Sequence, residues 1–308
     1  MSIVLLAQTR DLKPVREAFL KRDPNLDVEI WPDVRDKQRV QFAVAWKHPV
    51  GVFSNFPNLR AVSSLGAGVD HLMDDESIPE SMPITRVVAP SLTGDMSDYV
   101  KTAVLNYLRS THLFYRQQQR AEWNMVLAKD KKKHSVGIMG LGELGSQCAK
   151  DLVALGCKVN GWSRSRKEIE GVTSYTEKEL DQFLTATNIV VCLLPLTSKT
   201  ADILNLELFK KLKRPAHIIS VGRGEHLVEE DLVYALDAGI IHSATLDVFR
   251  QEPLPANHTF WNRKELVITP HIASVSDPDE AAEILLENYK RLMSGQPLLH
   301  RVDRKQEY

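Results

Sequence analysis

The sequence of 308 residues is longer than one ordinary hydrophobic core requires and is long enough for two domains. Hydrophobic residues make up 43% and charged residues 26%, and the formal net charge of −1 excludes the strongly basic balance of a general nucleic-acid binder. The apolar runs are far shorter than a membrane span, and the first ten residues lack the basic region and cleavage site of a signal peptide. We therefore expect neither a nucleic-acid nor a membrane partner.

Short apolar runs alternate with amphipathic stretches along the chain. The runs that predict strands are residues 2–8, 27–31, 41–46, 61–66, 84–88, 135–140, 157–162, 188–194, 216–222 and 242–248. Helical patterns lie between the later runs, at residues 142–156, 176–187 and 229–239. Alternation of this kind predicts an α/β fold class with parallel sheets.

Local signals mark several helix ends. Thr176 and Glu179 have the spacing of a capping box, and Gly239 is placed to follow the last turn of its helix. A long helical stretch from about residue 95 to 118 separates the two series of strands. The last helix, within residues 277–295, precedes a polar, basic tail that we expect to fold back over the first domain.

The three cysteines, Cys148, Cys157 and Cys192, are unevenly spaced and form no CxxC motif. Such spacing is typical of buried thiols in a reducing compartment, and it favours neither disulfides nor a metal site. The sequence therefore predicts a cytoplasmic protein without a structural metal.

Three glycines form the spacing G-x-G-x-x-G between a predicted strand and a predicted helix. Gly140 permits a tight turn, Gly142 lets the backbone approach a pyrophosphate, and Gly145 lets the helix pack closely on the strand. The helix N-terminus would then direct unpaired N–H groups toward phosphates. A bare glycine motif is weak, but the strand–turn–helix context favours a dinucleotide site over a structural turn.

The strand after this motif ends in "GWSRSRK" and lacks the acid that usually binds the ribose 2′-hydroxyl of NAD. No Asp or Glu occurs between Lys158 and Lys167, whereas Ser163, Arg164 and Ser165 follow the strand. Arginine pairs well with a phosphate that a carboxylate would repel, so the segment indicates the 2′-phosphate of NADP. The alternative is an exposed loop that happens to be basic, and within the segment Arg166 is the residue most easily assigned to solvent.

Three further polar residues each follow a predicted strand. Arg223 lies in "VGRG", Glu252 in "LDVFRQEP" and His271 in "ITPHIAS". The carboxyl ends of parallel strands meet at the edge where open α/β sheets bind ligands, so we expect these side chains at one edge. Taken alone, each has another interpretation: a surface salt bridge, a loop charge, and a helix cap or core histidine.

Together these segments resemble the D-isomer-specific 2-hydroxyacid dehydrogenases. The resemblance runs in order through "GIMGLGELG", "LLPLTSKTADILN", "VGRGEHLVEEDLVYAL", "LDVFRQEPLP" and "ITPHIAS", and "LGAGVDHL" is similar to the family's substrate loop. Within the family, "AVAWKHP", the serine–arginine run and "HRVDRKQEY" are most similar to the glyoxylate/hydroxypyruvate reductase A branch.

That resemblance implies the architecture and the activity. It implies two Rossmann-like or flavodoxin-like domains whose parallel sheets flank an active-site cleft. The substrate-binding domain would comprise residues 1–98 and 279–308, and the dinucleotide-binding domain residues 99–278. The implied enzyme is a cytoplasmic homodimer that reduces small 2-oxo acids such as glyoxylate and hydroxypyruvate with NADP(H), with weaker use of NAD(H).

The resemblance also implies residue roles. Arg223 would hold the 2-oxo acid, His271 would protonate its carbonyl oxygen, and Glu252 would orient His271 and favour its protonated form. The residues expected to bind the cofactor are Gly140, Leu141, Gly142, Glu143, Leu144, Gly145, Trp162, Ser163, Arg164, Ser165, Leu194, Pro195, Thr200, Val221, Gly222, Asp247 and Ala273, with Asp247 near the nicotinamide. Those expected to bind the substrate are Trp46, Leu65, Gly66, Ala67, Gly68, Arg223 and His271.

Two other functions stay open at this stage. One is a dehydrogenase of a different 2-hydroxy acid, because pocket size is poorly encoded in sequence. The other is a non-catalytic, NAD(P)-sensing protein on the same fold, similar to a corepressor. The intact Arg223, Glu252 and His271 argue against the second function.

Several aromatic residues and histidines have no assigned chemistry. We expect Trp123 and Trp261 to be packing residues, because large aromatic side chains mostly serve cores and interfaces. The histidines His48, His71 and His112 lack metal-ligand spacing and are interpreted as structural or exposed. The sequence does not decide whether Met96 and Tyr99 face a cleft.

Overall fold

The computed structural model describes residues 1–8 and 10–306, which form two compact units. One comprises Met1–Leu92 with Val275–Tyr308, and the other comprises Thr93–Ser274. Residues 307 and 308, which the predicted substrate-binding domain includes, lie outside the described residues. Each unit contains a parallel sheet with helices packed on it, so the predicted α/β fold class is confirmed.

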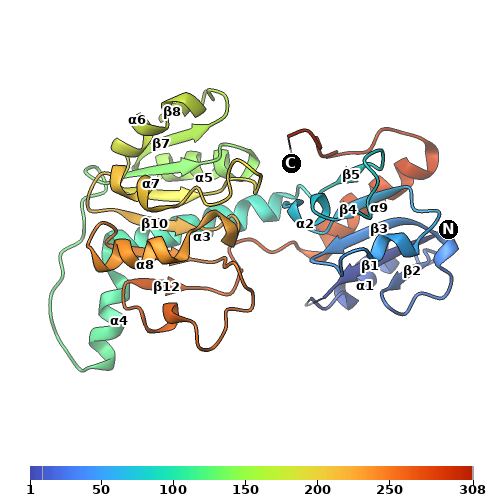
Figure 1. Cartoon of the computed structure of the whole chain (residues 1–308), viewed down its shortest axis with the longest axis horizontal. Helices are drawn as coiled ribbons and strands as arrows, with labels where there is room; N and C mark the ends of the chain where they lie inside the picture. The colour runs from blue at the N-terminus through green and yellow to red at the C-terminus, as the bar shows by residue number, and fades with distance from the viewer. Residues whose placement is uncertain (9, 307–308) are drawn as a thin grey trace. The chain divides into compact units, whose positions relative to one another are not determined.

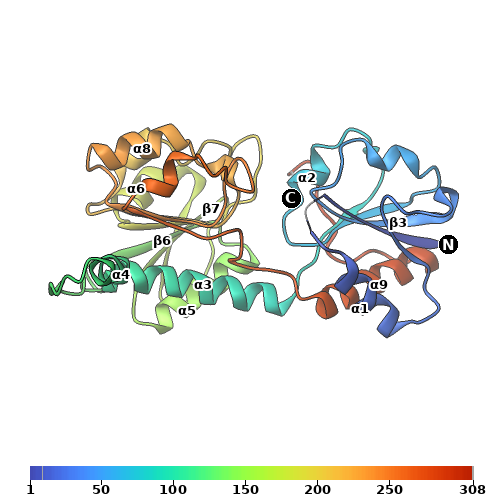
Figure 2. The same ribbon diagram turned by 90° about the horizontal axis from the view of Figure 1, so that it is seen from below.

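The described residues of the first unit form a five-stranded sheet in the order β2-β1-β3-β4-β5, with all neighbours parallel. Its strands are β1 (Ser2–Ala7), β2 (Val28–Ile30), β3 (Val40–Trp46), β4 (Ala61–Ser64) and β5 (Ile84–Thr85). Helices α1 (Lys13–Arg22) and α9 (Pro278–Ser294) lie together on one face, and α2 (Asp70–Met73) lies on the other side (Figure 2). Both faces are covered, so β1 is apolar at consecutive positions and does not alternate.

The C-terminal tail returns to the sheet of this first unit. The N–H of Val302 donates to the carbonyl of Ile84 at 2.9 Å, and Arg304 Nη1 donates to the carbonyl of Pro79 at 2.7 Å. The predicted fold-back is therefore confirmed for the described part of the tail. The strand predicted at residues 84–88 is shorter than expected, with only Ile84 and Thr85 in the ladder.

Residues 93–274 are all described and form a seven-stranded parallel sheet in the order β12-β11-β10-β9-β6-β7-β8. The strands are β6 (Ser135–Met139), β7 (Lys158–Ser163), β8 (Val172–Thr176), β9 (Ile189–Cys192), β10 (His217–Ser220), β11 (Ser243–Leu246) and β12 (Leu266–Ile268). The helices are α3 (Pro90–Arg109), α4 (Thr111–Gln119), α5 (Glu143–Ala154), α6 (Leu180–Thr185), α7 (Leu206–Lys211) and α8 (Glu229–Asp237).

This sheet has a hydrophobic core on each face. On one side Ile138 and Val191 pack with residues of α3 and α5, such as Val104 and Leu152. On the other side Met139 and Val190 pack with residues of α6, α7 and α8, which lie opposite α3 and α5 (Figure 2). Successive side chains of these strands therefore point to opposite faces of the sheet and pack in two different cores.

Short 3-10 helices complete the chain, at Lys37–Arg39, Val52–Asn55, Glu177–Glu179, Gly224–His226 and Thr259–Asn262. The helix predicted over about 95–118 is two helices, α3 and α4, because Ser110 adopts the left-handed conformation at φ 56°. The capping box of Thr176 and Glu179 is confirmed, as is Gly239, which follows α8 with φ 65°. No helix in the described part of the chain is long and apolar enough to cross a membrane.

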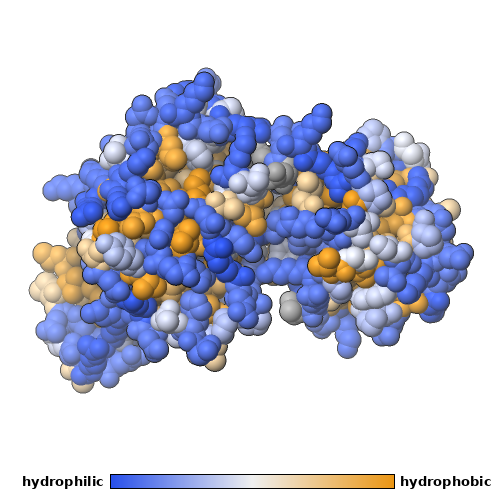
Figure 3. All heavy atoms as spheres, in the orientation of Figure 1, coloured by the Kyte–Doolittle hydropathy of each residue, from blue (hydrophilic) through white to orange (hydrophobic). Residues whose placement is uncertain are grey.

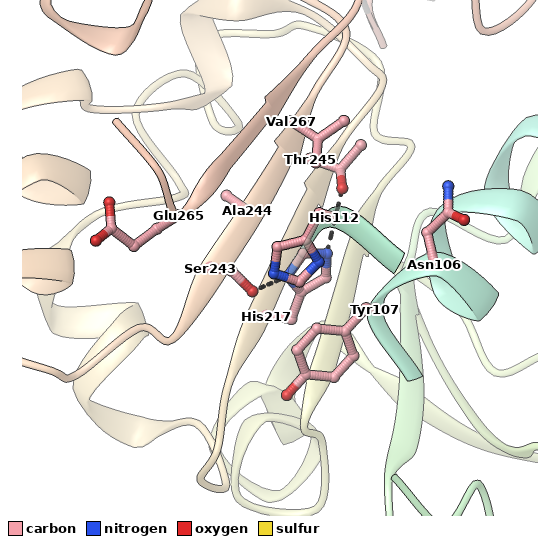
Figure 4. A pocket seen from close by; sticks show the side chains of 9 residues that line it. All are labelled: Asn106, Tyr107, His112, His217, Ser243, Ala244, Thr245, Glu265 and Val267. Atoms are coloured by element: carbon pink, nitrogen blue, oxygen red, sulfur yellow. Dashed lines mark hydrogen bonds between the residues drawn. The ribbon is translucent and has the colours of Figure 1, made fainter. Parts of the chain in front are cut away.

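A polar cluster lies beneath α3 and α4 at the β10–β11 side of the sheet (Figure 4). The ring of His217 stacks on Tyr107 at 4.3 Å between centroids, and its nitrogens contact the hydroxyls of Ser243 at 2.8 Å and Thr245 at 3.3 Å. Burial lowers the pKa of His217 to about 3, so His217 is neutral in the folded chain.

This burial predicts a loss of stability in acid. The unfolded chain gains a proton on His217 near pH 6.5, whereas the folded chain resists protonation until about pH 3, so the stabilisation is present above pH 6.5 and is lost as pH falls between these values. The free energy of unfolding should fall by about 1.4 kcal/mol per pH unit from this residue. Urea unfolding at several pH values should show a shallower slope in His217→Gln. The exposed His300→Gln variant is the control, and equal slopes in both variants would contradict the prediction.

Candidate active site

The glycine motif forms the turn between β6 and α5. Gly140 has φ 103°, and a Cβ there would lie 2.7 Å from the carbonyl oxygen of Leu193. A Cβ on Gly145 would overlap the carbonyl oxygen of Gly140, so the helix approaches the turn too closely for any side chain. Both positions therefore require glycine for steric reasons.

Gly142 differs from these two glycines because its surroundings are open. No heavy atom of the described residues outside its own chain neighbours lies within 4 Å of a Cβ built there. Gly142 is also the N-cap of α5, a helix of 12 residues, and no side chain caps that end. Open space beside the unpaired N–H groups of a helix terminus fits a bound pyrophosphate.

The segment after β7 lies next to this turn. The carbonyl of Trp162 accepts the N–H of Gly140 at 2.8 Å, while the Trp162 side chain packs in the core. Ser163 Oγ donates to the carbonyl of Ser165 at 2.8 Å, and Arg164 and Ser165 are exposed. Arg166 is exposed, as suggested from sequence, but its guanidinium also pairs with Glu179.

Three neighbouring strands bring the other predicted residues to the same edge of the sheet. Arg223 follows β10, Glu252 follows β11 and His271 follows β12. His271 Nδ1 lies 2.8 Å from Glu252 Oε2, and the other carboxylate oxygen of Glu252 accepts the N–H of Phe249 at 3.0 Å. A carboxylate only accepts hydrogen bonds, so Nδ1 carries the proton in this pair and Nε2 is the atom directed elsewhere.

A buried carboxylate fixes the backbone around His271. Asp247 Oδ1 accepts the hydroxyl of Thr269 at 2.5 Å and the N–H of Ile272 at 2.9 Å, and Oδ2 accepts the N–H of Ala273 at 2.9 Å. Tyr99 joins the network through Thr269 Oγ1 at 2.6 Å. These bonds hold His271 in a left-handed conformation, φ 53°, which non-glycine residues seldom adopt.

The loop that carries Arg223 is held by a histidine that the sequence analysis did not identify. His226 Nδ1 accepts the N–H of Arg223 at 3.0 Å, and its Nε2 faces the carbonyl of Pro195 at 3.3 Å. Thr200 Oγ1 donates to the same carbonyl at 2.6 Å. His226 is fully buried and lies three residues after Arg223, a capping spacing that could have drawn attention to it.

In the first unit, the predicted substrate loop packs directly on Trp46. A Cβ on Gly66 would lie 2.8 Å from the Trp46 ring, so glycine is required for this contact. The N–H of Leu65 donates to the carbonyl of Ala45 at 3.0 Å, and Ser64 Oγ donates to the carbonyl of Gly68 at 2.6 Å. The loop is therefore fixed by β3 and β4.

His71 and His48, which the sequence analysis interpreted as structural or exposed, form a series of ring contacts that begins at Trp46. The ring of His71 lies 5.3 Å from that of Trp46 and 5.7 Å from that of His48. His48 Nε2 lies 2.8 Å from Asp75 Oδ2. Burial lowers the pKa of His48. Burial alone would raise the pKa of Asp75, but the hydrogen bonds that Asp75 accepts from Ser77, His48 and Gly51 have the larger effect and lower its pKa.

Other sequence expectations are corrected or settled here. Trp123 is fully exposed and Trp261 is half exposed in the single chain, so neither packs in a core of the described residues. Trp123 lies in the extended connection after α4, where no other described part of the chain covers it. Met96 is buried in the core of the second unit. The described residues contain no group of three His, Cys, Asp or Glu side chains that could hold a metal ion.

Comparisons with known proteins agree with this geometry. Residues 102–273 match the NAD-binding domain of the D-isomer specific 2-hydroxyacid dehydrogenases. Glyoxylate/hydroxypyruvate reductase A of Yersinia enterocolitica is 36% identical over 98% of both chains. A D-isomer specific 2-hydroxyacid dehydrogenase from Xanthobacter autotrophicus, solved with NADPH and MES, is 37% identical with a TM-score of 0.93 over 100% of this chain and 99% of that one. An NADPH-dependent glyoxylate/hydroxypyruvate reductase from Sinorhizobium meliloti, solved with NADP and sulfate, is 37% identical with a TM-score of 0.94 over 100% of both chains.

Proposed function

The chain belongs to the D-isomer specific 2-hydroxyacid dehydrogenase family, and from this membership we propose that it reduces small 2-oxo acids, such as glyoxylate and hydroxypyruvate, with NADPH. The observation that carries the proposal is the His271–Glu252 pair at the edge of the sheet that also holds the glycine turn. The second unit holds the cofactor turn together with Arg223 and His271, and the first unit carries the predicted substrate loop.

NADPH is the preferred cofactor because the end of β7 carries no acid. Gly140 and Gly145 shape the turn, the open space at Gly142 receives the pyrophosphate, and residues 163–165 receive the 2′-phosphate. NADH lacks this phosphate and is used more weakly. The solved relatives named above contain NADPH or NADP, which supports the same preference here.

The bound cofactor supplies the hydride that reduces the carbonyl carbon. His271 donates a proton from Nε2 to the carbonyl oxygen, because its Nδ1–H is held by Glu252. The carboxylate stabilises the positive charge of the imidazolium before the transfer. Asp247, Thr269 and Tyr99 keep the histidine backbone in place during turnover.

Substrate binding is assigned to a cation and to backbone amides. The guanidinium of Arg223 pairs with the carboxylate and carbonyl of the 2-oxo acid. In the first unit, the N–H groups of Leu65–Gly68 are suited to a carboxylate of the substrate, and the glycines permit close approach. Trp46, fixed against Gly66, limits the size of the substituent on the acid.

We also propose that the protein is a cytoplasmic homodimer. Phe114, Tyr115, Trp123, Met125 and Leu127 project from α4 and the connection after it, where apolar atoms reach the surface (Figure 3). Trp123 is 101% exposed, Met125 87% and Leu127 78%. At about 200 Å² for a fully exposed large side chain, the five expose roughly 700 Å², close to the about 800 Å² per partner of a standard interface. A second copy of the chain would cover this surface, and the buried thiols suit a reducing compartment.

Replacement of the proton donor His271 or of the substrate-binding Arg223 should abolish most of the glyoxylate reductase activity. His271→Asn should lower kcat/KM for glyoxylate with NADPH by about 100- to 10,000-fold, as expected for loss of general acid catalysis. Arg223→Gln should lower it by about 100-fold, as expected for loss of a bidentate charged contact. His258→Asn is the matched control, because it removes another histidine–carboxylate pair of the same unit. Near wild-type turnover in both site variants would refute the assignment.

Gly142→Ala should separate cofactor binding from folding. A methyl group enters open space at φ −77°, so the urea midpoint should stay within the range of the exposed helical control Gly94→Ala. The same methyl group should weaken NADPH binding by about tenfold or more, since it stands where the pyrophosphate approaches. Fluorescence titration measures the affinity. Unchanged affinity would show that the pyrophosphate does not approach this turn.

Charges placed in the exposed apolar surface should dissociate the dimer. Trp123→Glu combined with Met125→Lys should shift the mass measured by light scattering from that of two chains to that of one. Trp261→Ala, which alters a half-exposed tryptophan elsewhere, should leave the mass unchanged. A wild-type mass of one chain, or a dimeric double variant, would contradict the proposed interface.

A further inference from the structure

The segment that follows β7 is tied to β8 and to the turn after it, although much of it is exposed. Arg166 Nη2 donates to both carboxylate oxygens of Glu179 at 2.7 Å, and Arg166 Nη1 donates to the carbonyl of Ser174. The N–H of Lys167 donates to Ser174 Oγ at 3.0 Å. The guanidinium therefore faces β8 and its following turn.

Glu179 is itself held in place by the capping box at the end of β8. Its Oε2 accepts the N–H and the hydroxyl of Thr176, both at 2.8 Å. Thr176 pairs with Ser163 in the β7–β8 ladder, so one end of the contact series is fixed by the sheet. Hydrogen bonds from Thr176 and Arg166 lower the pKa of Glu179 to about 2, so the partner of Arg166 is a carboxylate at neutral pH.

We propose that Arg166 is a positioning residue for cofactor selection: bound to Glu179 and Ser174, it holds residues 163–165 in the conformation that receives the 2′-phosphate and does not contact that phosphate itself. This inference rests on the proposed use of NADPH. It assigns different tasks to the two arginines of "SRSR", since Arg164 contacts the phosphate and Arg166 orders the segment.

Two physical effects support this division. The Arg166 side chain is 58% exposed, and an exposed ion pair adds little to global stability, so the pair acts on its own segment more than on the fold. Ordering a backbone residue on binding costs conformational entropy, a cost that a preordered segment does not incur. The guanidinium also neutralises Glu179, whose charge would otherwise repel an incoming phosphate.

The test uses binding of 2′,5′-ADP, with 5′-ADP as the probe that lacks the 2′-phosphate. Calorimetry on the intact protein measures both affinities in the wild type, Arg166→Gln, Glu179→Gln and the double variant. Glu179→Gln keeps a side chain that can complete the capping box but removes the charge. Asp237→Asn is the matched control, because it breaks an exposed pair with Arg263 in the same unit.

We expect each single variant to bind 2′,5′-ADP about tenfold more weakly, which is roughly the cost of ordering one residue. The affinity for 5′-ADP should be unchanged. The double variant should resemble the single variants, because the two residues act as one unit. If Arg166→Gln weakens 2′,5′-ADP while Glu179→Gln leaves it unchanged or strengthens it, Arg166 is a direct phosphate ligand and the inference is wrong. It is also wrong if neither variant changes the affinity.

The wild type separates this inference from the function on which it rests. A wild type that binds 2′,5′-ADP no tighter than 5′-ADP removes the NADPH preference, and the inference with it. A clear wild-type preference that survives in both variants overturns the role of Arg166 alone.

Discussion

The parallel pairing of the large sheet is the constraint on which the site depends. Parallel strands all end at one edge, so the turn after β6 and the loops after β9, β10, β11 and β12 open on the same side. Residues as distant in sequence as Gly140 and His271 are thereby brought to a common edge. A change of register in one strand would displace its loop and move its functional side chain away from the others.

The residues at this edge are held mostly by buried hydrogen bonds from beneath. Asp247 accepts three donors from the segment around His271, and His226 links the Arg223 loop to Pro195. Both supporting side chains are almost completely buried, so their bonds are little weakened by water. Preordering of this kind is what a hydride-transfer site requires, because reacting groups must meet in a narrow range of geometries.

Sequence predicts features that follow from local sterics or from a motif. The glycines at 140 and 145, the capping box of Thr176 and the parallel α/β alternation belong to this class, and the structure contains them. Contacts between residues that are far apart in sequence cannot be predicted from local sterics or from a motif. The series from Trp46 through His71 and His48 to Asp75 depends on how β3 meets the loop after β4, and no spacing in the sequence encodes it. The sequence does not show whether Trp123 packs in a core or in an interface, because the rule for large aromatics covers both, and the single chain shows only that it is outside the cores.

The low pKa of Glu179 has a consequence for how the chain senses acidity. Hydrogen bonds from Thr176 and Arg166 hold the pKa of Glu179 at about 2, so Glu179 keeps its charge in mildly acidic and neutral solution and its pair with Arg166 has no switch there. The 2′-phosphate, by contrast, gains or loses its second charge near pH 6, as phosphate monoesters do. A change in the preference for NADPH over NADH between mildly acidic and neutral solution would then come from protonation of the 2′-phosphate, because Arg166 and Glu179 keep their charges over this range.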